Sequence, residues 1–108
     1  MKKEYALRKL SKIVDSHWHE IAENLEILED IATHKAESNL SQLSSLVMSK
    51  TFYFLGEYSE SLRYALQSGN FFSLADVTDY ESTIASNFLL LKVRNYSFFL
   101  NFLVLSTI

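Results

Sequence analysis

The chain has 108 residues, of which 48% are apolar and 14% aromatic, so it can form one hydrophobic core. With no proline, two glycines and no cysteine, it lacks the turn chemistry of a many-stranded fold, a disulfide framework and a thiolate metal site. Its net charge of −3 argues against a nucleic-acid partner, because such partners are bound mainly by a basic face.

The apolar residues of the first third follow a helical period. From about Lys3 to Val14 they recur at i, i+3, i+4 and i+7, which predicts a first helix. Asp15 and Ser16 interrupt this pattern and offer side-chain oxygens that can cap a second helix. The second helix is predicted from about His17 to His34, with an acidic outer side. Its apolar stripe consists of Trp18, Ile21, Leu25, Leu28 and Ala32.

The polar stretch from Thr33 to Asn39 predicts a surface loop, and Ser38 or Asn39 is expected to cap a third helix. This helix runs to about Leu55. Its apolar residues cover more than one side, which is typical of a helix that packs against neighbours on two sides.

Both glycines, Gly56 and Gly69, stand where a helix has to end. The residue just past a helix often takes a positive φ, which glycine adopts without a Cβ penalty. The apolar positions also change face across Gly56. The sequence therefore predicts a tight antiparallel helical pair, whose second member runs from about Tyr58 to Ser68.

A short connector from Asn70 to Val77 is expected to pack its apolar residues Phe71, Phe72 and Leu74 under the helices. Thr78 and Glu81 then match the S/T-x-x-E capping box, in which each side chain satisfies a backbone N–H of the other residue. A fifth helix is predicted from Asp79 to about Leu91.

The predicted fold class is all-α, with about five helices in antiparallel hairpins stacked as the start of an α-solenoid rod. Residues 1–86 are expected to form this helical-hairpin domain, and residues 87–108 a divergent apolar C-terminal tail. The tail has no acidic residue. Its apolar stretch is shorter than the roughly 20 residues that span a bilayer, so an exposed, aggregation-prone segment is favoured over a membrane anchor.

No pattern in the sequence predicts an active site, a cofactor or a small-molecule substrate. His17 and His19 are two residues apart on a helix and therefore point in different directions. Pairing either of them with Glu20 or Glu23 supplies two ligands, whereas a zinc site takes three or four from the protein. The serines have no nucleophile-elbow sequence around them and are interpreted as helix-surface and capping residues: Ser38, Ser41, Ser44, Ser45 and Ser49.

Two further patterns have a structural and a functional interpretation. The acidic run from Glu20 to Asp30 fits a docking face for a basic partner, but the solvated side of an amphipathic helix is favoured. Several aromatic residues fit anchors for a partner helix, but packing within the chain is favoured for most of them. These residues are Tyr58, Tyr64, Phe71, Phe72 and Tyr80.

An ordered set of residues resembles the N-terminal part of a known family, the largest non-ATPase scaffold subunit of the 26S proteasome regulatory particle (non-ATPase regulatory subunit 1). The similarity covers roughly Lys3 to Ala85, begins with the stretch Lys3 to Leu10, and is strongest from Ser49 to Gly69. The family-matching structural positions are Trp18, Ser49, Lys50, Phe52, Tyr53, Leu55, Gly56, Glu60, Ser61, Leu62, Tyr64, Ala65, Leu66, Gly69, Phe72 and Tyr80.

The resemblance implies a non-catalytic scaffold role in ubiquitin-dependent protein degradation. It also implies other regulatory-particle subunits as partners, and the cytoplasm and nucleus as location. Family members are several times longer and contain a toroid of helical repeats, so the chain is expected to be a fragment or truncated product. The alternative is a free-standing tetratricopeptide-like adaptor for a protein partner. The stretch from Leu55 to Tyr58 and Ala65 resemble part of that repeat, but at least three repeats are usually needed for a stable stack.

Overall fold

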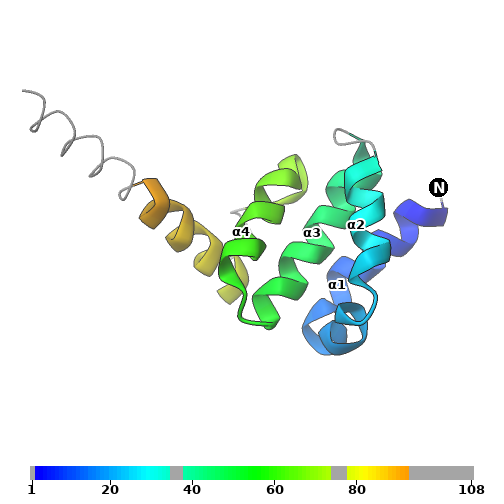
Figure 1. Cartoon of the computed structure of the whole chain (residues 1–108), viewed down its shortest axis with the longest axis horizontal. Coiled ribbons are helices and arrows are strands. Elements are labelled where there is room, and N and C mark those ends of the chain that lie inside the picture. The colour runs from blue at the N-terminus through cyan, green and yellow to red at the C-terminus, as the bar shows by residue number, and fades with distance from the viewer. Residues whose placement is uncertain (1, 35–37, 74–77, 93–108) are drawn as a thin grey trace, which may run out of the picture.

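The computed structural model describes residues 2–34, 38–73 and 78–92, and all secondary structure in these ranges is helical (Figure 1). The predicted all-α class is therefore confirmed. The elements are α1 (Lys2–Ala22), α2 (Leu25–His34), α3 (Asn39–Phe54), α4 (Tyr58–Gln67), the short 3₁₀ helix η1 (Gly69–Phe71) and a further helix over residues 79–92.

Helix α3 is the centre of the stack, because α1, α2 and α4 all pack against it. Figure 1 shows α1 and α2 on one side of α3 and α4 on the other, with the 79–92 helix beyond α4. Every residue from position 43 to position 49 is buried. The sequence predicted that this helix packs against neighbours on two sides, and the structure confirms it.

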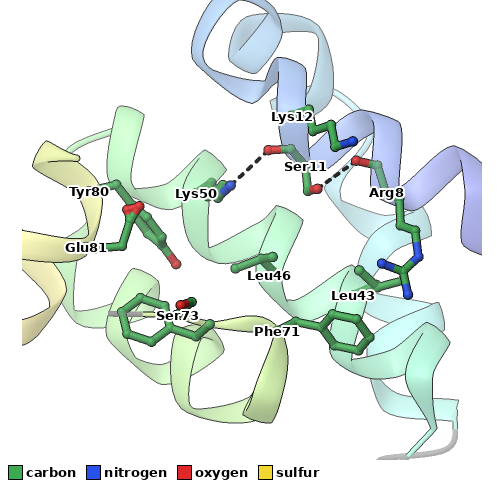
Figure 2. Close-up of a pocket in the computed structure, with 11 residues that line it drawn as sticks. Arg8, Ser11, Lys12, Leu43, Leu46, Lys50, Phe71, Ser73, Tyr80 and Glu81 are labelled. Atoms are coloured by element: carbon green, nitrogen blue, oxygen red, sulfur yellow. Dashed lines mark hydrogen bonds between the residues drawn. The ribbon is translucent and has the colours of Figure 1, made fainter. Parts of the chain in front are cut away.

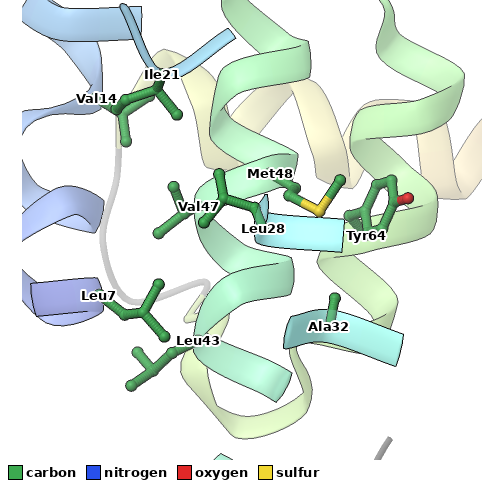
Figure 3. Packing of buried hydrophobic residues seen from close by; sticks show 9 residues of the cluster. All are labelled: Leu7, Val14, Ile21, Leu28, Ala32, Leu43, Val47, Met48 and Tyr64. Atoms are coloured by element: carbon green, nitrogen blue, oxygen red, sulfur yellow. The ribbon is translucent and has the colours of Figure 1, made fainter. Parts of the chain in front are cut away.

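The larger of two hydrophobic clusters joins α1, α2, α3 and α4 (Figure 3). Helix α1 contributes Leu7, Val14 and Ile21, which recur every two turns and so share one face. Burying each large aliphatic side chain contributes about 1.5–3 kcal/mol, so this face stabilises the stack strongly. The other buried members are Leu28, Ala32, Leu43, Val47, Met48 and Tyr64.

The smaller cluster joins α3 and α4 to the 79–92 helix. It consists of Leu46, Leu62, Ala65, Tyr80 and Ile84. Phe72, from the connector, is half-buried against this cluster, and Phe71 packs against both clusters, as the sequence predicted. Leu74, the third apolar residue predicted to pack there, lies outside the described residues.

The predicted boundary between the first two helices coincides with a kink inside α1. Helix α1 reaches Ala22, but His17 within it has non-helical backbone angles (φ −128°, ψ 17°), so two helical segments meet at the position where the sequence predicted the second helix to begin. The second predicted helix, from His17 to His34, is instead divided by a turn at residues 23–24.

Asn24 accounts for this turn. Its backbone N–H donates to the Ile21 carbonyl (2.9 Å), and its side-chain Nδ2 donates to the Glu20 carbonyl (3.0 Å). A short amide side chain that bonds to nearby carbonyls competes with the helical pattern. The turn was missed because the apolar stripe continues on both sides of it, from Ile21 to Leu28, and both residues enter the same cluster.

The end of α3 confirms the prediction for Gly56, which has φ +80°. Its N–H donates to the Tyr53 carbonyl (3.1 Å), and the Glu57 N–H donates to the Phe52 carbonyl (2.9 Å). These two bonds form a Schellman motif, which satisfies carbonyls left free at the helix end. Gly69 also has a positive φ, +57°, at the end of α4.

Thr78 and Glu81 meet at the start of the 79–92 helix, although the bonds that join them run between side chains. The Thr78 hydroxyl donates to the Glu81 carboxylate, with oxygen–oxygen distances of 2.7 and 2.5 Å. The predicted capping pair is thus in contact, through a different bond from the side-chain-to-backbone pattern that the motif implies.

Replacing Gly56 by alanine should lower the free energy of unfolding by about 1–2 kcal/mol, because a left-handed residue with a Cβ is strained. A Cβ at this position would meet nothing within 4 Å, so the loss would come from the backbone alone. Urea denaturation followed by circular dichroism measures it. Glu57→Ala is the control, since the Glu57 side chain makes no capping bond. Equal losses in the two variants would contradict the left-handed turn.

Candidate functional site

Four of the five serines singled out in the sequence line the contacts of α3. Ser41, Ser44, Ser45 and Ser49 are buried, so the prediction that they lie on the helix surface is wrong. Their small side chains let α2 and α4 approach α3, and their hydroxyls can bond to carbonyls of the neighbouring helices. Ser38 alone caps α3 as predicted, because its Oγ accepts from the Ser41 N–H at 3.1 Å.

Two of these hydroxyls bind α2. Ser44 Oγ donates to the Leu28 carbonyl (2.6 Å), and Ser41 Oγ donates to the Ala32 carbonyl. Ala32 is in the last turn of α2, where carbonyls have no partner within the helix. Ser41 therefore satisfies a group that would otherwise be buried without a hydrogen bond.

A second set of hydroxyls joins α3 to α4 and to the 79–92 helix. Ser49 Oγ donates to the Ser61 carbonyl (2.6 Å), and Ser61 Oγ donates back to the Ser49 carbonyl (2.7 Å). The Tyr80 hydroxyl lies 2.7 Å from Ser49 Oγ. Because a serine hydroxyl carries one proton, and Ser49 gives it to the carbonyl, Tyr80 must be the donor to Ser49. We call Ser49, Ser61 and Tyr80 the hydroxyl junction.

Lys50 connects the hydroxyl junction to α1. Its Nζ donates to the Ser11 carbonyl (2.9 Å) and lies 5.8 Å from the centre of the Tyr80 ring. The same region therefore ties together α1, α3, α4 and the 79–92 helix. These contacts fix one helix against the next, which is a structural task.

A cavity of about 350 Å³ opens beside this junction (Figure 2). Arg8 and Lys12 lie on one side, Glu81 lies on the other, and Lys50 is between them. Arg8 already pairs with Glu4 at 3.0 Å, and Lys50 is bound to a carbonyl. The cavity can admit an acidic side chain, but two of its three cations have partners.

The second cavity, also of about 350 Å³, is apolar and lies between α4 and the 79–92 helix. We call it the apolar groove. Its lining residues are Leu62, Ala65, Leu66, Phe72, Ile84, Ala85, Phe88 and Leu89.

The sixteen family-matching positions fall on α1, α3, α4, the adjoining turns and the 79–92 helix. Six are buried: Ser49, Ser61, Leu62, Tyr64, Ala65 and Tyr80. Six are half-buried: Trp18, Lys50, Phe52, Tyr53, Glu60 and Phe72. Four are exposed: Leu55, Gly56, Leu66 and Gly69.

The aromatic residues proposed as anchors mostly pack within the chain. Tyr80 meets Tyr53 and Phe72 edge to face, with ring centres 5.6 and 5.8 Å apart, and the Tyr64 ring stacks on Phe52 at 5.6 Å. Such pairs stabilise a fold beyond the area they bury. Tyr58 is the most exposed of them, and its ring lies 5.9 Å from the ring of Tyr53.

The histidines and acidic residues of α1 and α2 lie at the surface. His17 Nδ1 is 2.9 Å from Ser16 Oγ, and the His19 ring stacks on Trp18. Among the residues that the structure describes, no three His, Cys, Asp or Glu side chains could hold a metal ion. The carboxylates from Glu20 to Asp30 are exposed, as expected for a solvated side. No helix in the described ranges is long and apolar enough to cross a membrane.

A stack of helices that buried hydroxyls join to the central helix α3 is the architecture of a helical-repeat protein. Residues 1–97 match the model of the family described as 26S proteasome subunit RPN2, N-terminal domain. The chain belongs to this family. No solved structure matches the chain.

Proteins from distant organisms give the same result. The 26S proteasome non-ATPase regulatory subunit 1 homolog B of Arabidopsis thaliana is 38% identical over 83 residues, which cover 76% of this chain and 8% of the relative. The 26S proteasome non-ATPase regulatory subunit 1 of Drosophila melanogaster is 38% identical over 82 residues, which again cover 76% of this chain and 8% of the relative. The 26S proteasome regulatory subunit RPN2 of Saccharomyces cerevisiae is 30% identical over 95 residues, which cover 88% of this chain and 10% of the relative. The chain thus spans about a tenth of the length of these relatives.

Ser49→Ala should lower the free energy of unfolding by about 1–3 kcal/mol, because it leaves the Tyr80 hydroxyl and the Ser61 carbonyl without their buried partner. Ser45→Ala is the matched control. Ser45 Oγ is buried and has no hydrogen-bond partner within the described residues, so its removal should leave stability unchanged or raise it. Chemical denaturation of both variants measures the difference. Similar losses would show that the junction bonds do not stabilise the fold.

Burial raises the pKa of Tyr80, while the hydrogen bond to Ser49 lowers it by a smaller amount. In the unfolded chain a tyrosine loses its proton near pH 10. Above this pH the folded state holds a proton that the unfolded state has lost, so stability should fall by up to about 1.4 kcal/mol per pH unit. Alkaline denaturation curves should show a steeper loss than those of Tyr80→Phe. Parallel curves would contradict a buried neutral phenol.

Proposed function

We propose that this chain is a non-catalytic scaffold segment, corresponding to the N-terminal helical part of the proteasome regulatory particle's large non-ATPase subunit. It would act in ubiquitin-dependent protein degradation. The match of residues 1–97 to the family carries this proposal. The relatives are themselves named non-ATPase regulatory subunits of the 26S proteasome.

The buried contacts support a structural role for the family-matching positions. Ser49, Ser61 and Tyr80 bond to one another, and Tyr64 packs in the larger cluster. Their part in the proposed function is to hold α3, α4 and the 79–92 helix at fixed angles. We assign residues 1–86 to this scaffold unit and residues 87–108 to a separate apolar segment.

The proposed partners are other subunits of the regulatory particle, met in the cytoplasm and nucleus. Neither nucleic acid nor a small-molecule substrate is part of this proposal. The net charge of −3 and the exposed carboxylates of α2 support the first exclusion. The exposed carboxylates from Glu20 at the end of α1 to Asp30 on α2 are compatible with a basic partner.

The test is purification of the tagged chain from cells, followed by mass spectrometry. Subunits of the regulatory particle should be enriched with it. The control is Val47→Asp, which places a charge at a fully buried position and should abolish both helicity and enrichment.

Enrichment of a chaperone without proteasome subunits would instead favour the tetratricopeptide-like adaptor. Equal enrichment with the native chain and with Val47→Asp would show that the folded stack is not what the partners bind, and would overturn the proposal.

A further inference from the structure

The cavity beside the hydroxyl junction is lined by positive charge from two helices (Figure 2). Arg8 and Lys12 come from α1, and Lys50 comes from α3. One carboxylate, that of Glu81, lines the same cavity. The volume of about 350 Å³ is at the lower end of the roughly 300–1,000 Å³ that is typical of ligand pockets. The cavity therefore has room for one side chain of a partner rather than for a large organic ligand.

Lys50 is the least exposed of the three cations, and no described residue neutralises its charge. Its side chain is half-buried, and its Nζ donates to the Ser11 carbonyl at 2.9 Å. This acceptor is uncharged and takes only one of the three donors of an ammonium group. No carboxylate in residues 2–34, 38–73 and 78–92 forms an ion pair with Lys50. A half-buried ammonium group without a counter-ion attracts an anion from outside the chain.

Aromatic rings hold two of the three cations in place at the cavity. The Arg8 guanidinium lies 5.4 Å from the centre of the Phe71 ring, and Lys50 Nζ lies 5.8 Å from the centre of the Tyr80 ring. These contacts restrict both groups before a ligand arrives, which lowers the entropic cost of binding. Arg8 also pairs with Glu4, but this pair is partly exposed and such surface pairs are weak. Arg8 can therefore exchange Glu4 for an incoming carboxylate at little cost.

Glu81 limits the charge of the ligand. Its side chain is buried, and its carboxylate accepts a hydrogen bond from the Thr78 hydroxyl at 2.7 Å. Figure 2 shows Glu81 on the side of the cavity opposite Arg8 and Lys12. A phosphate group carries up to about twice the charge of a carboxylate, so Glu81 repels it about twice as strongly. The cavity is therefore better suited to a single carboxylate on the side of Arg8 and Lys12 than to a phosphate.

The uncharged part of the lining suits the stem of an acidic side chain. Leu43, Leu46 and Phe72 supply apolar surface beside the cations. The methylene groups of a glutamate pack against such a surface, and its apolar atoms exclude water and strengthen the attraction between the charges. Arg8 and Lys12 are exposed on α1, so the residues that flank the bound side chain can extend along the surface of that helix.

We propose that this cavity binds the carboxylate side chain of an acidic peptide segment in a partner protein. The carboxylate lies between Lys50 and Lys12, and Arg8 closes the rim over it. Glu81, on the opposite wall, selects a single negative charge. This inference goes beyond the proposed scaffold function, because it assigns a binding site and the chemistry of its ligand, whichever protein supplies the segment.

The test is a titration of the purified, isotope-labelled full chain with a short acidic peptide, followed by nuclear magnetic resonance. The probe is the peptide Gly-Glu-Gly-Glu-Gly with blocked termini, and the matched control peptide has glutamine in place of both glutamates. Amide signals of residues that line the cavity, among them Ser11 and Lys50, should shift with the first peptide and stay unchanged with the second. Free glutamate and a phosphoserine version of the peptide are two further arms.

Two lysine variants of equal net charge locate the bound carboxylate. Lys12→Met removes an exposed cation that lines the cavity and should weaken binding about three- to fivefold. Lys9→Met is the matched control, because Lys9 is exposed on the same helix and does not line the cavity. It should bind the peptide as the native chain does. Equal losses in the two variants would show that binding follows net charge alone, and would overturn the proposal.

Two further variants test the walls of the cavity. Lys50→Met should weaken binding about tenfold or more, because it removes the half-buried charge. Circular dichroism checks that this variant folds, and Lys12→Met answers the question if it does not. Glu81→Gln keeps an acceptor for the Thr78 hydroxyl and removes the negative charge. It should strengthen binding of the acidic peptide severalfold and of the phosphoserine peptide by more.

The remaining outcomes are equally decisive. Absence of shifts at the cavity, or tighter binding of the phosphoserine peptide to the native chain, would overturn the proposal. Free glutamate that binds as tightly as the peptide would assign the cavity to a small carboxylate and overturn the peptide partner. All measurements use the purified chain alone. A negative result here therefore leaves the scaffold function standing, and a failed co-purification from cells leaves this site standing.

Discussion

The arrangement of the helices depends on hydroxyl groups buried on the two sides of α3. On one side Ser41 and Ser44 donate to carbonyls of α2, and on the other Ser49 exchanges hydrogen bonds with α4. Apolar side chains alone pack in several registers, because the hydrophobic effect has no direction. A hydroxyl bonded to one particular carbonyl selects one register of the two helices. In any other register the buried hydroxyl and carbonyl would lose their hydrogen bond, and leaving such groups without a partner costs more free energy than the bond contributes when it forms.

The hydroxyl junction extends this constraint beyond neighbours in sequence. Tyr80 donates to Ser49 across 31 positions of the chain, and Lys50 reaches back to the Ser11 carbonyl. The angle of the 79–92 helix is therefore set by α3 as well as by α4. In a rod built by stacking helices, a small change in the angle between two neighbouring helices is repeated along the length of the rod. The precision of the angle at each helix–helix contact therefore matters more than the free energy of that contact. A buried polar junction suits this requirement.

Local chemistry made the ends of α3 and α4 predictable, whereas tertiary contacts decided what was missed. Gly56 could be assigned a positive φ from its place after an apolar helix, and Ser38 could be assigned as a cap. The turn at Asn24 was hidden, because the apolar stripe continues across it. The buried serines were misplaced for a related reason. A serine bonded to a neighbouring helix and a serine in water follow the same sequence pattern, and only the packing of α3 separates them.

The two ends of the stack differ in a way that fits a segment of a longer assembly. Along α2 the outer side carries exposed carboxylates, which remain hydrated, together with one exposed apolar side chain, Ile27. Beyond α4 the exposed surface is apolar, with Leu66 and Leu89 open to solvent. A helical stack is stable in water only when its terminal unit presents a polar outer side. The α2 side, with its carboxylates around Ile27, comes closer to this condition than the α4 side, where Leu66 and Leu89 are exposed without charged neighbours in the groove lining.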